Sequence, residues 1–170
     1  MRTDTSTKLD VMNATSFDDF YLREFRSMVA LAAAVSGSSL LAEDLAQEAM
    51  ARIYDRWDRV SGYDKPGAFA RRVTINLASS RRKRDAVAER GRSRLGAQYA
   101  VPPPPEPHTE VWEAVAALPP KQRAAVALHY LEDLPITEIA VILGCTAATA
   151  RVHLHRARNT LATLLEGQER

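Results

Sequence analysis

A run of prolines limits what this chain can fold into more than any other feature of its sequence. Five prolines lie within the eight residues Ala100–Pro107, which read AVPPPPEP. Proline lacks the N–H group that a helix interior needs, and its ring clashes with the preceding helical turn. An extended segment is therefore expected here. Together with the arginine- and glycine-containing run before it, residues 85–109 are predicted to form a flexible linker between two domains.

The part before the linker has the periodicity of helices, and residues 1–16 precede it as a polar N-terminal tail. The first helix is expected to start near Ser16, and its apolar positions are Phe17, Phe20, Tyr21, Phe25, Met28 and Val29. A second helix, ending near Val60, is predicted by an i, i+4 series: Leu41, Leu45, Ala49, Ile53 and Trp57. A loop over residues 61–67 leads to a third helix over residues 68–84, and residues 17–84 form the first domain. No segment alternates with the period of two of a half-buried strand, so an all-α fold is predicted.

Residues 110–170 are predicted to form a second small helical domain. A short helix over residues 111–118 is stopped by two prolines, the second of which, Pro120, suits the first position of a helix reaching Leu131. Pro135 separates that helix from a final pair of helices. The expected fold is therefore two small helical domains joined by the proline-rich linker.

The final pair, Thr137–Arg158, predicts a helix-turn-helix. Gly144 lies where the first helix must end in a left-handed residue, and the Thr146 hydroxyl can cap the next helix. In that second helix Ala150, Leu154, Ala157 and Leu161 share one apolar face, and Arg151, His155 and Arg158 share another. A helix that packs by one face and presents cations on the other is suited to a DNA major groove. A surface helix with merely solvated arginines is the alternative.

The net charge of +2 conceals an uneven distribution of acidic and basic residues along the chain. Residues 1–60 hold 10 acidic and 7 basic residues, a net charge of −3, whereas residues 71–94 hold 9 basic and 2 acidic residues, a net charge of +7. Residues 95–138 return to −4, and the rest of the chain carries +2. Local patches decide where a polyanion binds. The two basic segments therefore predict two DNA contacts, which the acidic segment between them would hold apart.

Several protein classes are disfavoured by what the sequence lacks. Its apolar runs are shorter than a membrane span, and its N-terminus lacks the apolar core of a signal peptide. The single cysteine, Cys145, cannot form an internal disulfide, which is typical of a reducing compartment. No phosphate-binding glycine loop, HExxH or G-x-S-x-G motif marks a catalytic site. We expect a cytoplasmic protein that is not an enzyme, needs no cofactor and does not insert into membranes.

Residues Ala42–Val60, AEDLAQEAMARIYDRWDRV, carry a family resemblance. The order Asp-Leu-x-Gln-Glu, an aliphatic and aromatic series after it and a Trp-Asp pair resemble region 2.2 of bacterial sigma factors. With the basic helix, the linker and the terminal helix-turn-helix, the chain resembles the extracytoplasmic-function class of the sigma-70 family. This resemblance implies a factor that directs promoter-specific transcription initiation by binding core RNA polymerase and recognising −10 and −35 elements. It covers nearly everything except the tail and the linker.

The resemblance implies roles for individual residues. The polar strip of the second helix would bind the clamp helices of the polymerase largest subunit through Asp44, Leu45, Gln47 and Glu48. The polymerase flap is a further expected partner. The −10 element would be read as single-stranded DNA by Ser61, Tyr63, Lys65, Arg71, Arg72, Asn76, Arg81, Arg82 and Arg84. Duplex −35 DNA would be read by Thr146, Ala147, Thr149, Arg151, His153, His155 and Arg156. A solvated acidic face and a solubilising arginine surface are the alternatives.

Other functions remain open at this point. A metal site at His153 and His155 is disfavoured, because no cysteine or carboxylate lies at a suitable spacing. Glu132 and Asp133 are interpreted as helix-end charges. A standalone helix-turn-helix regulator of the LuxR type would share the last two helices, but the Asp-Leu-x-Gln-Glu helix argues against it. A sigma-like decoy that binds a regulator and not DNA is a further alternative, and the basic second helix of the final pair weighs against it. The resemblance also implies an anti-sigma factor as a partner.

Overall fold

The computed structural model describes residues 16–94 and 109–166, and all regular elements in these ranges are α-helices. The N-terminal lobe, residues 16–94, contains α2 (Phe17–Ser36), α3 (Ser39–Tyr54), α4 (Trp57–Val60) and α5 (Pro66–Arg94). The C-terminal lobe, residues 109–166, contains α6 (Thr109–Ala117), α7 (Pro120–Tyr130), α8 (Ile136–Leu143) and α9 (Ala147–Glu166). The predicted all-α fold is confirmed. Residues 1–15 of the predicted tail and 95–108 of the predicted linker lie outside the described ranges.

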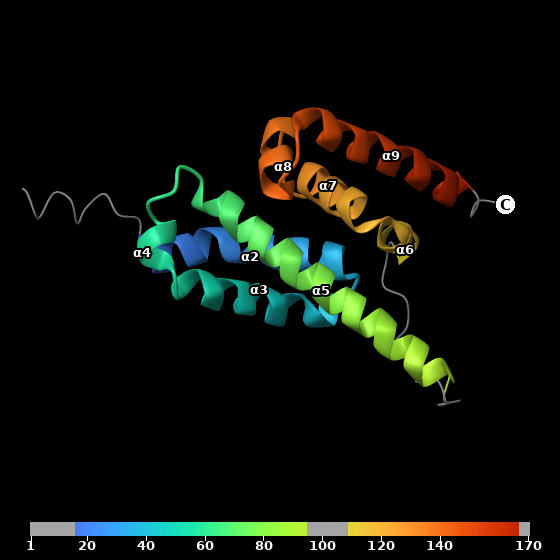
Figure 1. Ribbon diagram of the computed structural model, residues 1–170, viewed down its shortest axis with the longest axis horizontal. Coiled ribbons are helices and arrows are strands. Elements are labelled where there is room, and N and C mark those ends of the chain that lie inside the picture. Colours follow the sequence, from blue (N-terminus) through green and yellow to red (C-terminus); the bar gives the residue numbers. More distant parts are fainter. Residues whose placement is uncertain (1–15, 95–108, 167–170) are drawn as a thin grey trace, which may run out of the picture.

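Helix α2 begins where its sequence predicts, and it ends at a left-handed glycine. The Ser16 Oγ accepts a hydrogen bond from the Asp19 N–H at 3.1 Å, which satisfies one of the free donors of the first turn. Gly37 ends the helix with φ 74°, and its N–H bonds the Ala33 carbonyl oxygen. The reversal at Gly37 lets α3 return antiparallel beneath α2, and both helices then contribute to one apolar core with α5 (Figure 1).

The second predicted helix is interrupted before Val60, which corrects the expectation of one continuous helix. Helix α3 ends at Tyr54, and the short α4 begins at Trp57. Between them the Arg56 N–H bonds the Ile53 carbonyl, and Arg56 leaves the helical region with φ −124°. After this break the Trp57 ring packs on Phe20, with ring centroids 4.9 Å apart. Periodicity alone could not show the break, since Trp57 continues the i, i+4 series.

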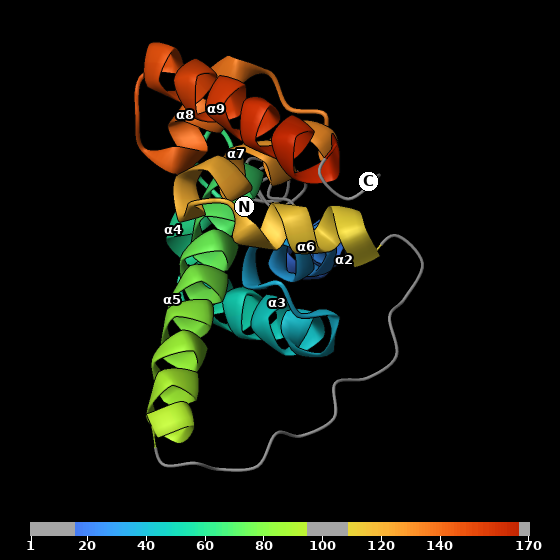
Figure 2. The ribbon, with the colours of Figure 1, turned by 90° about the vertical axis from the view of Figure 1, so that its right-hand side faces the viewer.

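Helix α5 is longer than predicted at both ends. It starts at Pro66, inside the expected loop, and continues ten residues past Arg84 through Gly91. Two pairs of side chains support the extension: Arg81–Asp85 at 3.0 Å and Arg92–Glu89 at 2.7 Å. The glycine and arginine content of this run favoured a linker, but its alanines and spaced charges favour a helix. The extended end projects from the rest of the molecule (Figure 2).

The helix-turn-helix is confirmed in detail. Gly144 ends α8 in the left-handed region with φ 66°, and the Thr146 Oγ1 accepts a hydrogen bond from the Thr149 N–H at 3.1 Å. Helix α8 and helix α9 meet at 100°. Ala150, Leu154 and Ala157 are buried as the periodicity predicted, and Leu161 is half-buried. The predicted start of α7 at Pro120 is also confirmed.

The two lobes pack against each other over a shared apolar core. One hydrophobic cluster contains Phe20, Met28 and Leu31 of α2 together with Leu128 of α7 and Ile139 of α8. Helices α7, α8 and α9 lie on the side of α2 opposite α3 in both views (Figures 1 and 2). In the described ranges no single helix has the length and apolar character needed to cross a membrane; α8 and α9 meet those limits only as the bent pair just described.

Candidate polymerase and DNA interface

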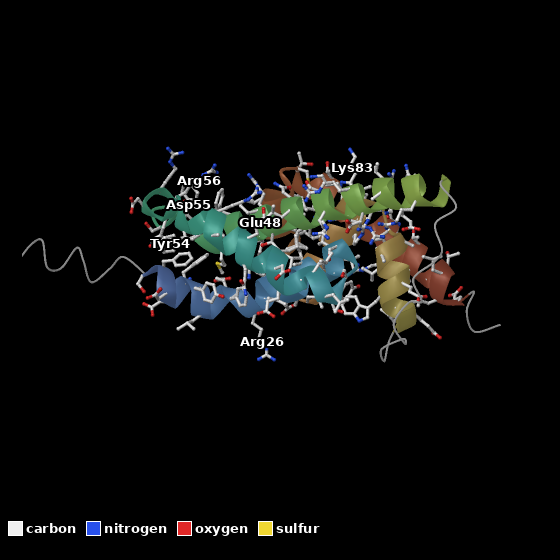
Figure 3. All side chains as sticks on the ribbon, turned by 90° about the horizontal axis from the view of Figure 1, so that it is seen from below. Arg26, Glu48, Tyr54, Asp55, Arg56 and Lys83 are labelled. Atoms are coloured by element: carbon white, nitrogen blue, oxygen red, sulfur yellow. The ribbon has the colours of Figure 1, made fainter. Side chains whose placement is uncertain are left out.

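The polar strip of α3 is exposed to solvent. Asp44, Gln47 and Glu48 are exposed, and Glu48 accepts a hydrogen bond from Arg52 Nη2 at 2.6 Å on the same helix. Figure 3 views the molecule from the side of α3 and labels Glu48 on this helix. Leu45, which the resemblance grouped with them, is only 5 % exposed and lies in the core. The structure therefore presents three of these four side chains on the surface and uses the fourth to anchor the helix.

The loop before α5 supplies an aromatic edge. Tyr63 is 40 % exposed, and its ring meets the Phe69 ring edge-on with centroids 5.5 Å apart. Phe69 itself is half-buried against the core. Ser61 lies at the end of α4 with its hydroxyl 3.5 Å from the Asp58 carbonyl oxygen. An exposed tyrosine on a supported loop is a surface on which a base can stack.

Arg71 lies between two carboxylates instead of facing solvent. Its Nε donates to Glu132 Oε2 at 2.6 Å, and its Nη1 donates to Glu24 Oε2 at 3.0 Å. The side chains of Arg71, Glu24 and Glu132 are only 15 %, 13 % and 3 % exposed. Glu132 was interpreted as a helix-end charge, and that interpretation is wrong, because its carboxylate forms an ion pair across the two lobes.

Three further cations of the predicted −10 set also reach the C-terminal lobe. Lys65 Nζ lies 2.8 Å from Glu138 Oε1. Arg72 donates to the Ile142 carbonyl at 3.1 Å and also to the Val141 carbonyl, at the end of α8. Arg82 donates to the Ser36 carbonyl at 3.0 Å and to the Ala116 carbonyl of α6 at 2.6 Å. Arginine favours such sites because the last carbonyls of a helix lack partners and carry partial negative charge.

The other residues of the predicted −10 set are accessible. Asn76 and Arg84 are exposed on α5, and Arg81 is half-buried beside Asp85. The structure therefore divides the nine predicted residues into an open group and a group directed at the C-terminal lobe. Sequence spacing could not make this division, because the partners lie 34 to 73 residues further along the chain.

The predicted −35 residues gather on the outer side of α9 and at its start. Thr146, Thr149, Arg151, His155 and Arg156 are exposed, while Ala147 and His153 are half-buried. His155 Nε2 lies 3.2 Å from the Asn159 side-chain nitrogen one turn away. Arg158 is exposed but engaged, since its Nε donates to the Tyr130 hydroxyl at 2.8 Å. Arg151 and Arg156 are thus exposed in the first half of the helix, which is the part of a recognition helix that meets base edges.

Arg123 is a residue that sequence reasoning missed. It is 4 % exposed on α7, and its guanidinium donates to the Val35 carbonyl of α2 at 2.7 Å and to the Leu118 carbonyl at 2.9 Å. Desolvation by burial, with the charge of Arg82 as the second cause, lowers the pKa of Arg123 to about 10. The guanidinium is still charged at neutral pH. Only its position directly before an apolar run, Ala124–Leu128, could have signalled burial.

No group of three or more His, Cys, Asp or Glu side chains in the described ranges is arranged to hold a metal ion. Cys145 is half-buried and packs against the shared core.

The exposed acidic strip of α3, the cationic α5 and the outer face of α9 form three separate polar surfaces. Their chemistry suits binding to protein and nucleic acid.

Two protein-family models match the chain. The model for sigma-70 region 2 matches residues 20–87, and the model for sigma-70 region 4 matches residues 108–161. The first match covers most of the N-terminal lobe, and the second covers most of the C-terminal lobe including the helix-turn-helix.

Individual relatives agree with these models. The chain is 33 % identical over 131 residues to an RNA polymerase sigma-E factor of Streptomyces antibioticus, covering 75 % of this chain and 72 % of that protein. It is also 33 % identical over 167 residues to the ECF RNA polymerase sigma factor SigE of Mycolicibacterium smegmatis, covering 88 % of this chain and 62 % of that one.

The fold resembles two solved structures. The sigma factor RpoE from Bartonella quintana, in complex with the anti-sigma factor NepR, superposes with a TM-score of 0.67 at 23 % identity, covering 88 % of this chain and 96 % of that one. The structure of CnrH in complex with the cytosolic domain of CnrY superposes with a TM-score of 0.66 at 16 % identity, covering 95 % of this chain and 94 % of that one. At these identities the two structures show a shared fold. The family models and the sequence relatives go further: the chain belongs to the extracytoplasmic-function class of the sigma-70 family, whose members direct transcription initiation by RNA polymerase.

Proposed function

We propose that this sigma factor binds core RNA polymerase through the exposed strip of α3 and reads its promoters through two separate surfaces. The −10 strand would be held by the loop before α5 and by α5 itself, and the −35 duplex by the first half of α9. The clamp helices and the flap of the polymerase are the expected docking partners. As a sigma factor the chain is a non-enzymatic polymerase subunit.

One observation supports this proposal most directly: the strip and the recognition helix are both exposed, on opposite sides of the molecule. Asp44, Gln47 and Glu48 lie on α3, while Arg151 and Arg156 lie on α9. Charge-assisted hydrogen bonds from arginines of a partner would suit the first surface, and DNA phosphates and guanines would suit the second. The two surfaces can therefore engage polymerase and DNA at the same time.

Core binding is tested by replacing two residues of the strip. The variant Gln47→Ala, Glu48→Ala should weaken binding to sigma-free core polymerase, because it removes two polar partners from an exposed docking surface without touching the core. The matched control is Glu110→Ala, Glu113→Ala, since both glutamates are exposed on α6. Affinity is measured by competition with a labelled sigma factor. Equal affinities for the variant and the control would contradict the assignment of α3.

Promoter recognition is tested by transcription from genomic DNA. Wild-type chain and core polymerase should give discrete start sites that share two upstream motifs. Arg151→Ala, Arg156→Ala should reduce initiation that depends on the upstream motif while core affinity stays unchanged. Arg158→Ala is the matched control on the same helix, because that guanidinium binds Tyr130. Absence of start sites with folded wild-type protein would contradict the proposed function.

An anti-sigma factor is a further proposed partner. The solved structure of the sigma factor RpoE from Bartonella quintana is a complex with the anti-sigma factor NepR. A partner that covers the α3 strip or the cations of α5 would prevent polymerase or promoter binding. We also propose a cytoplasmic location, because core polymerase and promoter DNA are found there. Purification of the tagged chain from a cytoplasmic fraction, followed by identification of bound proteins, tests both points.

A further inference from the structure

An exposed valine lies in the first half of α9, on the surface proposed to read the −35 duplex. Val152 is 45 % exposed, and in the described part of the chain it belongs to neither of the two apolar clusters. Helix α9 itself lies at the outer edge of the C-terminal lobe, with α7 and α8 on its inner side (Figure 1). The proposed −35 contacts do not include Val152. Its place on the helix indicates what it contacts.

The periodicity of α9 directs Val152 away from the protein. Ala150, two residues before it, and Leu154, two residues after it, are both buried. In a helix two residues correspond to about 200° of rotation, so Val152 points almost opposite to both of them. His153, which the sequence placed among the −35 contacts, is half-buried by comparison. Val152 is therefore among the side chains of α9 that face a bound duplex most directly.

Cations lie on both sides of Val152. Arg151 directly precedes it, Arg156 follows one turn later, and both are exposed. Contacts from such cations to phosphates fix the position of a protein on DNA but carry no sequence information. The phosphates border the major groove, and the base edges form its floor. An outward side chain between two cations on a helix in that groove therefore meets base edges.

The chemistry of valine suits one kind of base edge. In the major groove thymine presents a methyl group at C5, whereas the other three bases present hydrogen-bonding groups. Contact between the valine and that methyl group removes apolar surface from water on both sides. Beside a polar edge, valine would displace water without replacing its hydrogen bonds, which costs free energy. The branched side chain also has one strongly preferred rotamer in a helix, so contact restricts it little further.

We propose that Val152 is a specificity-determining residue that recognises the C5 methyl group of one thymine in the −35 element. Ala148, one turn earlier on the same face and also exposed, would extend the apolar surface. This inference rests on the proposed assignment of α9 to −35 recognition. It adds the identity of one base, which the charges of α9 alone do not provide.

Helix formation does not account for valine at this position, because valine favours a helix less than alanine does. The side chain also lies outside both apolar clusters. The variant Val152→Ala should therefore melt at the same temperature as wild type or slightly higher. A loss of DNA affinity in this variant would then come from a lost contact and not from unfolding. Thermal melting followed by circular dichroism checks this point.

The test removes one methyl group from the DNA and the valine side chain from the protein. Start sites mapped with wild-type chain and core polymerase define the −35 element. Each thymine of that element, on either strand, is replaced in turn by deoxyuridine, which lacks only the C5 methyl group. The affinity of the polymerase holoenzyme for each promoter is measured by competition. The matched control is Val111→Ala, because Val111 is a valine on α6 with the same exposure, 45 %.

One thymine should stand apart in this series. Its replacement by deoxyuridine should weaken binding of the wild-type and Val111→Ala holoenzymes roughly fourfold, the effect of one buried methyl group. The Val152→Ala holoenzyme should bind the unmodified promoter severalfold more weakly than wild type. Deoxyuridine at the same position should then change its affinity by less than about 1.5-fold, because the methyl group no longer has its partner.

Three results would overturn the inference. The first is a series in which no thymine methyl group affects binding, and the second is an equal effect of deoxyuridine with wild type and Val152→Ala. The third is a −35 element that contains no thymine on either strand. Start sites separate this inference from the proposed function. Start sites that depend on Arg151 and Arg156 keep the proposed function when no methyl group is read, whereas absent start sites with folded wild-type protein remove both.

Discussion

Replacing Gly144 by alanine tests how far the helix-turn-helix depends on one backbone conformation. Gly144 has φ 66° and ψ 42°, and the Cys145 N–H after it bonds the Ala140 carbonyl at 3.0 Å. A Cβ built at this position would have no atom within 4 Å, so alanine introduces no clash. The cost is therefore that of the left-handed backbone alone, about 1–2 kcal/mol for a residue with a Cβ.

This cost should be visible as a loss of thermal stability. For a chain of this length about 1–2 kcal/mol corresponds to a decrease in Tm of roughly 2–8 °C. Gly144→Asn is the matched control, because asparagine tolerates the left-handed region better than alanine and should lose less than half as much. Melting is followed by circular dichroism at 222 nm, a wavelength that reports helix content. If the alanine variant has the Tm of wild type, or if asparagine lowers Tm as much as alanine does, the conformation of Gly144 does not determine stability here.

Three further outcomes are expected. Thr146→Ala should reduce the unfolding free energy by about 1 kcal/mol through loss of the cap, and a serine there should restore it in urea titrations; a serine variant as unstable as alanine would contradict the capping role. Leu128→Ala should reduce the unfolding free energy by about 2–5 kcal/mol in the same assay, since the Leu128 side chain is fully buried. Leu22 is 80 % exposed, so Leu22→Ala should change it by less than about 0.5 kcal/mol. Similar losses in both variants would refute the assigned core. Arg156→Ala should reduce by about 1 the slope that relates the logarithm of the binding constant for duplex DNA to the logarithm of the salt concentration. An unchanged slope would exclude a phosphate contact at Arg156.

Local chemistry made much of this fold predictable. The glycine that ends α8, the threonine that caps α9 and the apolar stripe through Leu154 are all short-range signals, and the structure has each of them where the sequence placed it. The start of α7 at Pro120 belongs to the same group. Exposure of the α3 strip also follows from its i, i+3, i+4 spacing, because the opposite face carries the apolar residues that α3 buries.

What the sequence could not predict depends on contacts between distant segments. Arg71 and Glu132 are 61 residues apart, and no local pattern indicates that these two would meet. The long α5 was missed for a different reason: the arginine-rich run resembles a linker in composition, although its side-chain pairs support a helix. The candidate surfaces were located by family resemblance. Which of their cations are free and which are engaged could be learned only from the packing of the two lobes.

The buried contact between Arg123 and the Val35 carbonyl has a consequence for biosynthesis. The two residues are 88 positions apart, so at about 5–20 residues per second the ribosome needs roughly 4–18 s to add the arginine after the valine. For part of that interval the N-terminal lobe with its cationic helix has been synthesised, and the segment that covers it has not. A nascent or prematurely ended chain therefore exposes its arginines beside the RNA of the ribosome that made it. Only translation of the C-terminal lobe supplies the acceptors that bind Arg71, Arg72 and Arg82.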